Sequence, residues 1–324
     1  DVAILGIAGL LVGALVSIVL AKRVSEPVSR LAEAARVIGS GGFDHRVRVE
    51  SSDEVGKLAE SFNAMADSLE AHTAKLARAT AEKEVLAREL DIAAEIQQSL
   101  LPEACPRVEN FDIAAASVPA REVGGDFYDF IPLPEGRWGV VVADVSGKGV
   151  PAALLMALSR SLIRAYSQDN PSILRAMKTA NRFLLEDVRS GMFVTCFYGV
   201  MDPVRRSFTY VNAGHNPPVV ATGGDIVILP ASGTPLGVME ESGVREETCQ
   251  LHPGNIVIMY TDGITEAMNE YGEQFGTTRL EDIARNSSRF TAAEISEHLL
   301  TAVRTFTMGQ SQFDDMTAVV LKVS

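Results

Sequence analysis

The chain has 324 residues, enough for two or more domains with a substantial core, and 47% of them are hydrophobic and 22% charged. Its net charge of −13 argues against a general nucleic-acid-binding protein, whose affinity depends on neutralising phosphates. The three cysteines form no CxxC pair and are odd in number, which suits a reducing compartment and argues against a disulfide framework or a structural zinc site.

Residues 2–21 contain no charged side chain. As a helix this run would span roughly 30 Å, the thickness of one bilayer core. Lys22 and Arg23 follow directly, and the positive-inside rule then places the downstream residues in the cytoplasm, with the helix in the inner or plasma membrane. A signal peptide would carry its charges before the apolar run. We therefore expect a transmembrane helix at 2–21; the alternative is a buried core helix.

Residues 22–70 predict two helices joined by a glycine-rich connector. Apolar residues repeat at helical spacing in the first helix, at Val28, Leu31, Ala35 and Ile38. The sequence GSGG at 39–42 ends that helix, and Pro27 lies near its start. With this early proline and DEVG at 53–56, the block resembles a HAMP domain. The resemblance implies a parallel four-helix dimer that transmits conformational signals to an effector, without identifying the effector.

Apolar residues continue in 3-4 alternation from Val55 to Leu100. A heptad seam of this length predicts a coiled coil and hence a homodimer. We assign residues 71–101 to a coiled-coil signalling helix. A second apolar stripe off the seam contains Val85, Ile92 and Ile96. We expect this stripe to dock on the domain that follows, so that rearrangement of the HAMP domain and coiled coil would control its activity.

From residue 102 to 324 the pattern changes to short apolar runs separated by turn signals. Six runs read as strands, at 111–117, 138–145, 193–202, 208–214, 255–263 and 316–323. Helical patterns fall near 150–167, 171–188, 279–287 and 292–306. Because the strands cluster before and after the helices rather than alternating with them, we expect an α+β fold with mainly antiparallel sheets.

Carboxylates stand beside several of these runs. Asp126 precedes the strand-like FYDF, Asp144 ends RWGVVVAD, Asp262 ends NIVIMYTD, and Asp314 and Asp315 precede the last strand. Strand ends from distant segments can converge on one rim of a sheet, and oxygen ligands are those that Mg²⁺ or Mn²⁺ prefer. The pattern therefore predicts a site for hard divalent cations.

Each motif alone has an ordinary alternative. An Asp-Gly after an apolar run is commonly a hairpin turn, and paired aspartates before a strand are commonly a solvated edge. GGDFYD at 124–129 also resembles the GGDEF signature of diguanylate cyclases, which often follow HAMP domains. Phe127, however, stands where that signature needs an acid, and a cyclase would not explain the other motifs.

The motifs in combination resemble the SpoIIE/RsbU-type serine phosphatases, which are metal-dependent type 2C (PPM) protein phosphatases. The resemblance rests on PAREVGGDFYDF (119–130), ADVSGKGVPAALLM (143–156), NAGHNPP (212–218), YTDGITEA (260–267) and FDDMTAVVLKV (313–323). It implies an α/β sandwich of two mainly antiparallel sheets flanked by helices, over residues 102–324.

The resemblance also implies a site with two Mn²⁺ or Mg²⁺ ions. Its ligands would be Asp126, Asp144, the Val145 carbonyl, Asp262 and Asp314, with Asp315 in support. Arg121 occupies the phosphate-binding arginine position of the wider family. Asp129 would be structural, Lys148 stands where His is frequent and is given no proton-transfer role, and His215 is more simply a turn histidine.

By the same resemblance, the protein would hydrolyse phosphoserine or phosphothreonine on an anti-sigma-factor antagonist of STAS fold, without a covalent phosphoenzyme. Two alternatives remain open: a catalytically inactive pseudophosphatase that serves as an interaction module, and a HAMP-linked diguanylate cyclase. The stimulus, the physiological substrate and the preferred metal are not encoded in any motif.

Overall fold

The computed structural model describes residues 2–48, 53–168, 172–187 and 191–324. Contacts divide the chain into an N-terminal unit, 1–88, and a C-terminal unit, 89–324. Each unit is described by itself below, and α3 contributes residues to both.

The N-terminal unit begins with the apolar helix α1, Val2–Leu20. A π-helical segment, Ala21–Ser25, joins it to α2, Glu26–Gly39, which has proline in its first turn as predicted. No charged side chain lies in α1, and its described side chains are exposed. By length and composition, this is the one helix among the described residues that could cross a membrane.

A small core holds α2, the connector and the start of α3, Glu54–Leu100, together. Its buried members are Leu31, Ala34, Val47 and Ala59, with Phe62 packed against them. The Asn63 side chain donates to the Val47 carbonyl and accepts from the Val47 N–H, both at 2.9 Å. Asp53 accepts from the N–H groups of Val55 and Gly56 and so caps α3. Val47, in the described part of the connector, is thus held by both side-chain packing and hydrogen bonds from Asn63 to its backbone.

Helix α3 is continuous over 47 residues, as the heptad pattern predicts. Several of its seam residues are exposed in the single chain, among them Leu58 at 54%, Leu76 at 55% and Leu86 at 56%. Such a row of exposed leucines on one helix is what an unpaired coiled-coil strand presents.

The expectation that the Ile92 and Ile96 stripe docks on the following domain is wrong for the single chain, because these side chains are 56% and 61% exposed. Gln97 makes the contact instead. Its amide donates to the Gly124 carbonyl at 2.7 Å and accepts from the Gly124 N–H at 3.0 Å. A polar clamp therefore joins the end of α3 to the glycine pair before Asp126.

The C-terminal unit contains two five-stranded antiparallel sheets. The first has the order β1 (Phe111–Val118), β10 (Met316–Val323), β9 (Ile256–Tyr260), β6 (Val219–Thr222) and β7 (Asp225–Ile228). The second has the order β2 (Phe127–Pro132), β3 (Trp138–Val145), β4 (Val194–Asp202), β5 (Ser207–Ala213) and β8 (Glu247–Gln250). The predicted α+β class with antiparallel sheets is confirmed.

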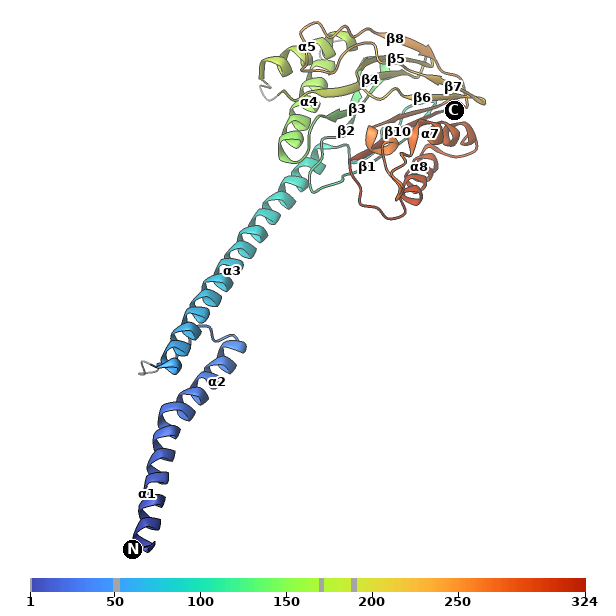
Figure 1. Ribbon diagram of the computed structural model, residues 1–324. Coiled ribbons are helices and arrows are strands. Elements are labelled where there is room, and N and C mark those ends of the chain that lie inside the picture. The colour runs from blue at the N-terminus through green and yellow to red at the C-terminus, as the bar shows by residue number, and fades with distance from the viewer. Residues whose placement is uncertain (1, 49–52, 169–171, 188–190) are drawn as a thin grey trace. The chain divides into compact units, whose positions relative to one another are not determined.

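The sheets pack face to face between two pairs of helices (Figure 1). Helices α4 (Val150–Gln168) and α5 (Ile173–Asp187) cover the second sheet, and α7 (Gly276–Asn286) and α8 (Ala292–Thr307) cover the first. Alternation along β3 serves both layers, because Val140 and Val142 face the other sheet while Val141 and Ala143 face the helices.

The six predicted strands all form, and apart from the end of the run at 255–263 every strand end lies within one residue of the predicted position. The run at 255–263 differs, because β9 ends at Tyr260 and Asp262 opens the short helix α6, Asp262–Thr265. Strands β6, β7 and β8 were not predicted. Each is only four residues long, too short for a clear alternation of buried and exposed positions.

The Gln97 clamp yields a test. Replacing Gln97 with Ala removes two hydrogen bonds from the Gly124 backbone, each of them worth about 1 kcal/mol. We expect amide hydrogen exchange in residues 122–127 to become faster in Gln97→Ala. The adjacent exposed Gln98, replaced in the same way, serves as the control and should leave exchange unchanged. Equal exchange in both variants would contradict a holding role for Gln97.

Candidate active site

The aspartates singled out in the sequence lie at one end of both sheets. Asp126 immediately precedes β2 and Asp144 is the penultimate residue of β3; these strands are antiparallel neighbours, with Phe127 opposite Ala143. In the other sheet, Asp262 follows β9 and Asp314 precedes β10, and these strands are also antiparallel neighbours. Pairing in each sheet therefore brings two distant chain segments together.

The carboxylates of the two sheets influence one another's pKa. Burial and then the charge of Asp144 raise the pKa of Asp126 well above its usual value. Burial, followed by the charges of Asp262 and Asp314, raises the pKa of Asp144 to about 7. Burial and then Asp314 raise the pKa of Asp262. The ionisation of Asp126, Asp144 and Asp262 is thus opposed by neighbouring carboxylates, and a cation among them would relieve that repulsion.

Thr261 links Asp126 to the other sheet. Its buried hydroxyl donates to Asp126 Oδ2 at 2.6 Å and accepts from the Thr317 N–H at 2.9 Å. The sequence reasoning missed this residue, because a threonine at the end of a strand is ordinary by composition. Its position directly before Asp262 was the available signal.

Asp315 fixes the loop that carries Asp126. Its Oδ1 accepts from the Ala120 N–H and its Oδ2 from the Gly125 N–H, both at 2.8 Å. With both oxygens engaged by the backbone, Asp315 acts in this structure as an anchor for residues 120–126.

The glycines around the site make these close approaches possible. A Cβ on Gly124 would collide with the Asp315 carboxylate, and one on Gly263 with the Asp315 carbonyl. A Cβ on Gly125 would lie 2.9 Å from the Val145 carbonyl oxygen, the predicted backbone ligand. The glycine pair at 124–125 therefore lets its loop lie against both Asp315 and Val145.

Lys148 is the cation that the structure places on this cluster. Its Nζ lies 2.8 Å from Asp314 Oδ2, donates to the Phe313 carbonyl at 2.7 Å and lies 3.9 Å from the centroid of the Phe313 ring. Lys148 thus neutralises one of the four acids. The sequence reasoning gave this residue no role.

Three other residues considered in the sequence, Asp129, Arg121 and His215, make no ion pair or hydrogen bond with the four acids among the described residues. Asp129 is buried and pairs with Arg164 at 2.8 Å and Arg160 at 3.1 Å, both on α4, a structural role as expected. Arg121 is exposed, and the described residues provide no ion-pair partner for its guanidinium.

His215 is also buried. Its Nδ1 lies 2.8 Å from the Thr195 hydroxyl, and burial lowers its pKa to about 3. It is therefore neutral at physiological pH and packed into the fold, in keeping with a structural turn histidine.

The donor set fits hard divalent cations, since it consists of carboxylate and carbonyl oxygens without thiol or imidazole. In the described parts of the chain, no three His, Cys, Asp or Glu side chains are gathered closely enough to count as a metal-ligand cluster. The acids are near enough to shift one another's pKa, but their oxygens do not converge on a single point.

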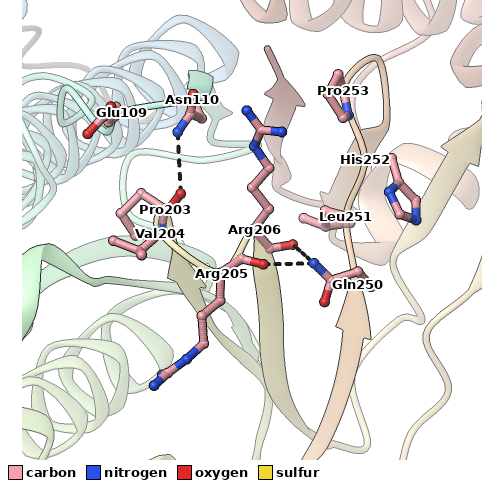
Figure 2. A pocket seen from close by; sticks show the side chains of 10 residues that line it. All are labelled: Glu109, Asn110, Pro203, Val204, Arg205, Arg206, Gln250, Leu251, His252 and Pro253. Carbon is pink, nitrogen blue, oxygen red and sulfur yellow. Dashed lines mark hydrogen bonds between the residues drawn. The ribbon is translucent and has the colours of Figure 1, made fainter.

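The cavity in Figure 2 lies at the other end of the second sheet. It measures about 470 Å³ and is lined by the β4–β5 turn, the end of β8 and residues 109–110. Gln250 donates to the Arg205 carbonyl at 2.7 Å and Asn110 to the Pro203 carbonyl at 3.3 Å, which ties these segments together. No aspartate of the predicted site lines this cavity.

Comparisons with known proteins agree with this geometry. Residues 134–324 match the family described as Stage II sporulation protein E (SpoIIE), and residues 19–71 match the HAMP domain. The chain is 30% identical to Protein IcfG of Synechocystis, over 91% of this chain and 51% of that protein. It is 34% identical to the phosphoserine phosphatase RsbU of Bacillus subtilis, over 57% of this chain and 55% of that protein.

Among solved structures, the SiaA-PP2C domain of Pseudomonas aeruginosa has the same fold, with a TM-score of 0.65, 24% identity, and coverage of 75% of this chain and 98% of that domain. The chain spans about half the length of the curated relatives it matches. The family match covers more than half of the chain and leaves no support for the diguanylate cyclase alternative. The chain belongs to the SpoIIE family, with a PP2C fold following a HAMP domain.

Proposed function

We propose that this protein is a membrane-anchored, metal-dependent protein serine/threonine phosphatase. One observation carries the proposal: paired strand ends in both sheets bring Asp126, Asp144, Asp262 and Asp314 to a single end of a PP2C fold, where neighbouring carboxylates raise the pKa of the first three. An inactive interaction module would have no need to retain such a costly arrangement. The proposed organisation is a transmembrane helix at 2–21, a HAMP domain at 22–70, a signalling helix at 71–101 and a phosphatase domain at 102–324.

The proposed ligands are Asp126, Asp144, the Val145 carbonyl, Asp262 and Asp314, with two Mn²⁺ or Mg²⁺ ions. Bound divalent cations supply a water of lowered pKa and positive charge for the phosphate oxygens. The chain itself orients these ligands. Thr261 holds one oxygen of Asp126, and Asp315 holds the backbone of the loop before it. Arg121 is exposed and lies five residues before Asp126 in the sequence. It is proposed as an additional phosphate contact.

The proposed substrate class is based on the similarity of the chain to a named phosphatase. RsbU bears the name phosphoserine phosphatase, and we propose a phosphorylated anti-sigma-factor antagonist of STAS fold as the substrate here. The exposed leucine seam of α3 supports a homodimer through the HAMP domain and coiled coil. The apolar helix α1 followed by Lys22 and Arg23 supports a plasma-membrane location with a cytoplasmic phosphatase domain.

The direct test is hydrolysis of p-nitrophenyl phosphate by the detergent-solubilised chain with Mn²⁺. We expect turnover that is abolished by EDTA and lowered by at least about 100-fold in Asp262→Asn, because the substitution removes a charged ligand from the site. Asp225→Asn, an exposed carboxylate on β7, is the matched control. Full metal-dependent turnover in Asp262→Asn would contradict the assignment.

The raised pKa of Asp144 predicts the pH dependence of stability. Because its pKa is about 7 in the folded chain and 3.8 as a reference, the metal-free chain should lose stability as pH rises from about 4 toward 7. At pH 8 in EDTA, Asp144→Asn should therefore have a higher Tm than the unmodified chain, by roughly 2–4 °C for each kcal/mol of repulsion relieved.

The same Asp144→Asn substitution should weaken Mn²⁺ binding. The Asp144 carboxylate would thus lower the stability of the metal-free chain while contributing to metal binding. Thermal unfolding followed by circular dichroism measures the first effect, with Asp225→Asn as the control. An unchanged or lower Tm of Asp144→Asn at pH 8 would contradict the prediction that the Asp144 charge destabilises the metal-free folded chain.

Lys148 predicts a change in metal affinity. Since its ammonium pairs with Asp314, Lys148→Gln should free that ligand and remove a nearby positive charge. We expect the Mn²⁺ dissociation constant, measured by calorimetry, to fall roughly two- to five-fold, the range for a partly exposed ion pair. The exposed Lys178, replaced by Gln, is the control. Weaker Mn²⁺ binding in Lys148→Gln would contradict this prediction and would mean that Lys148 helps to position Asp314 for the cation.

A further inference from the structure

A groove of about 380 Å³ opens beside the acidic cluster. It lies between the segment after α6 and the segment between α8 and β10. Its lining includes Gly263, Ala267, Met268, Val303, Phe313 and Met316. Asp314, one of the four acids, also lines it, so the groove and the proposed catalytic site share a wall.

The groove is largely apolar although it is open to solvent. Val303 and Met316 are buried in it, while Met268 is 49% and Phe313 is 76% exposed. Glu266 and Arg304 add one charge of each sign. Large apolar side chains left exposed around a hollow mark a binding surface more often than an ordinary free surface.

Because Asp314 belongs to both the groove and the proposed catalytic site, the groove is placed to hold part of the substrate. A phosphoserine whose phosphate lies at the four acids brings the neighbouring residues of its own chain to within roughly 3–7 Å of the site, because an extended chain advances about 3.3–3.6 Å per residue. The groove begins at Asp314 and Gly263, within this reach. Arg304 offsets Glu266, and Asp314 is paired with Lys148, so the groove offers no general attraction for a charged side chain.

We propose that this groove binds the segment of the phosphoprotein that flanks the phosphoserine and selects apolar side chains there. The proposal rests on the proposed phosphatase function and adds a preference for sequence around the phosphorylated residue. Met268 contributes to this selection as a specificity residue at the exposed side of the groove, separate from the acids that hold the phosphate end.

The test uses two fluorescent peptides that carry a non-hydrolysable phosphonate in place of phosphoserine and differ only in having Leu or Ser at the two positions on either side. Binding to the full solubilised chain is measured by anisotropy in Mn²⁺. We expect the Leu peptide to bind about ten-fold more tightly or better, the size of effect that an apolar pocket gives.

Met268→Glu should remove this preference by placing a charge in the apolar lining. Met239→Glu is the matched control, because Met239 is 46% exposed and does not line the groove. Equal binding of the two peptides by the unmodified chain, or an unchanged preference in Met268→Glu, would overturn the groove proposal.

Hydrolysis of p-nitrophenyl phosphate by the unmodified chain separates this proposal from the proposed function. Turnover without a peptide preference contradicts the groove alone. A Leu preference without turnover supports the groove and contradicts the phosphatase.

Discussion

The repulsion among four carboxylates is the constraint on which the rest of the C-terminal unit depends. Asp126 is buried and the other three acids are half-buried; neighbouring charges in such a site are unfavourable without a cation, so other contacts must hold them in place. Pairing of β2 with β3 and of β9 with β10 supplies the positions. Thr261 ties Asp126 to the first sheet, and Asp315 binds the loop that carries it. The glycines at 124, 125 and 263 leave the space that these contacts need.

Much of this arrangement could be predicted from the sequence because its signals are local. A carboxylate next to an apolar run marks a strand end, and the order of the motifs indicated the family. The roles of Thr261 and Lys148 depend on partners 135 and 165 residues away in the sequence, which no local pattern reveals. Asp315 illustrates the same limit, since its sequence position suggested a supporting ligand while its backbone partners lie almost 200 residues away. The apolar groove likewise forms only when two separate loops meet.

The helix that leads into the phosphatase domain shows a second limit of sequence patterns. Apolar periodicity directed attention to Ile92 and Ile96, which are exposed in the single chain. Gln97, a poor seam residue by its polarity, makes two hydrogen bonds to Gly124. Gly124 is two positions before Asp126, so a shift of this helix would act directly on the loop that carries a proposed ligand.

The central claim is that the acids of the two sheets hold divalent cations. The most direct measurement is anomalous diffraction from crystals of the protein grown with Mn²⁺. The account predicts anomalous peaks among Asp126, Asp144, Asp262 and Asp314, with Lys148 moved away from Asp314. A folded chain with no peak at this position at millimolar Mn²⁺ would contradict it.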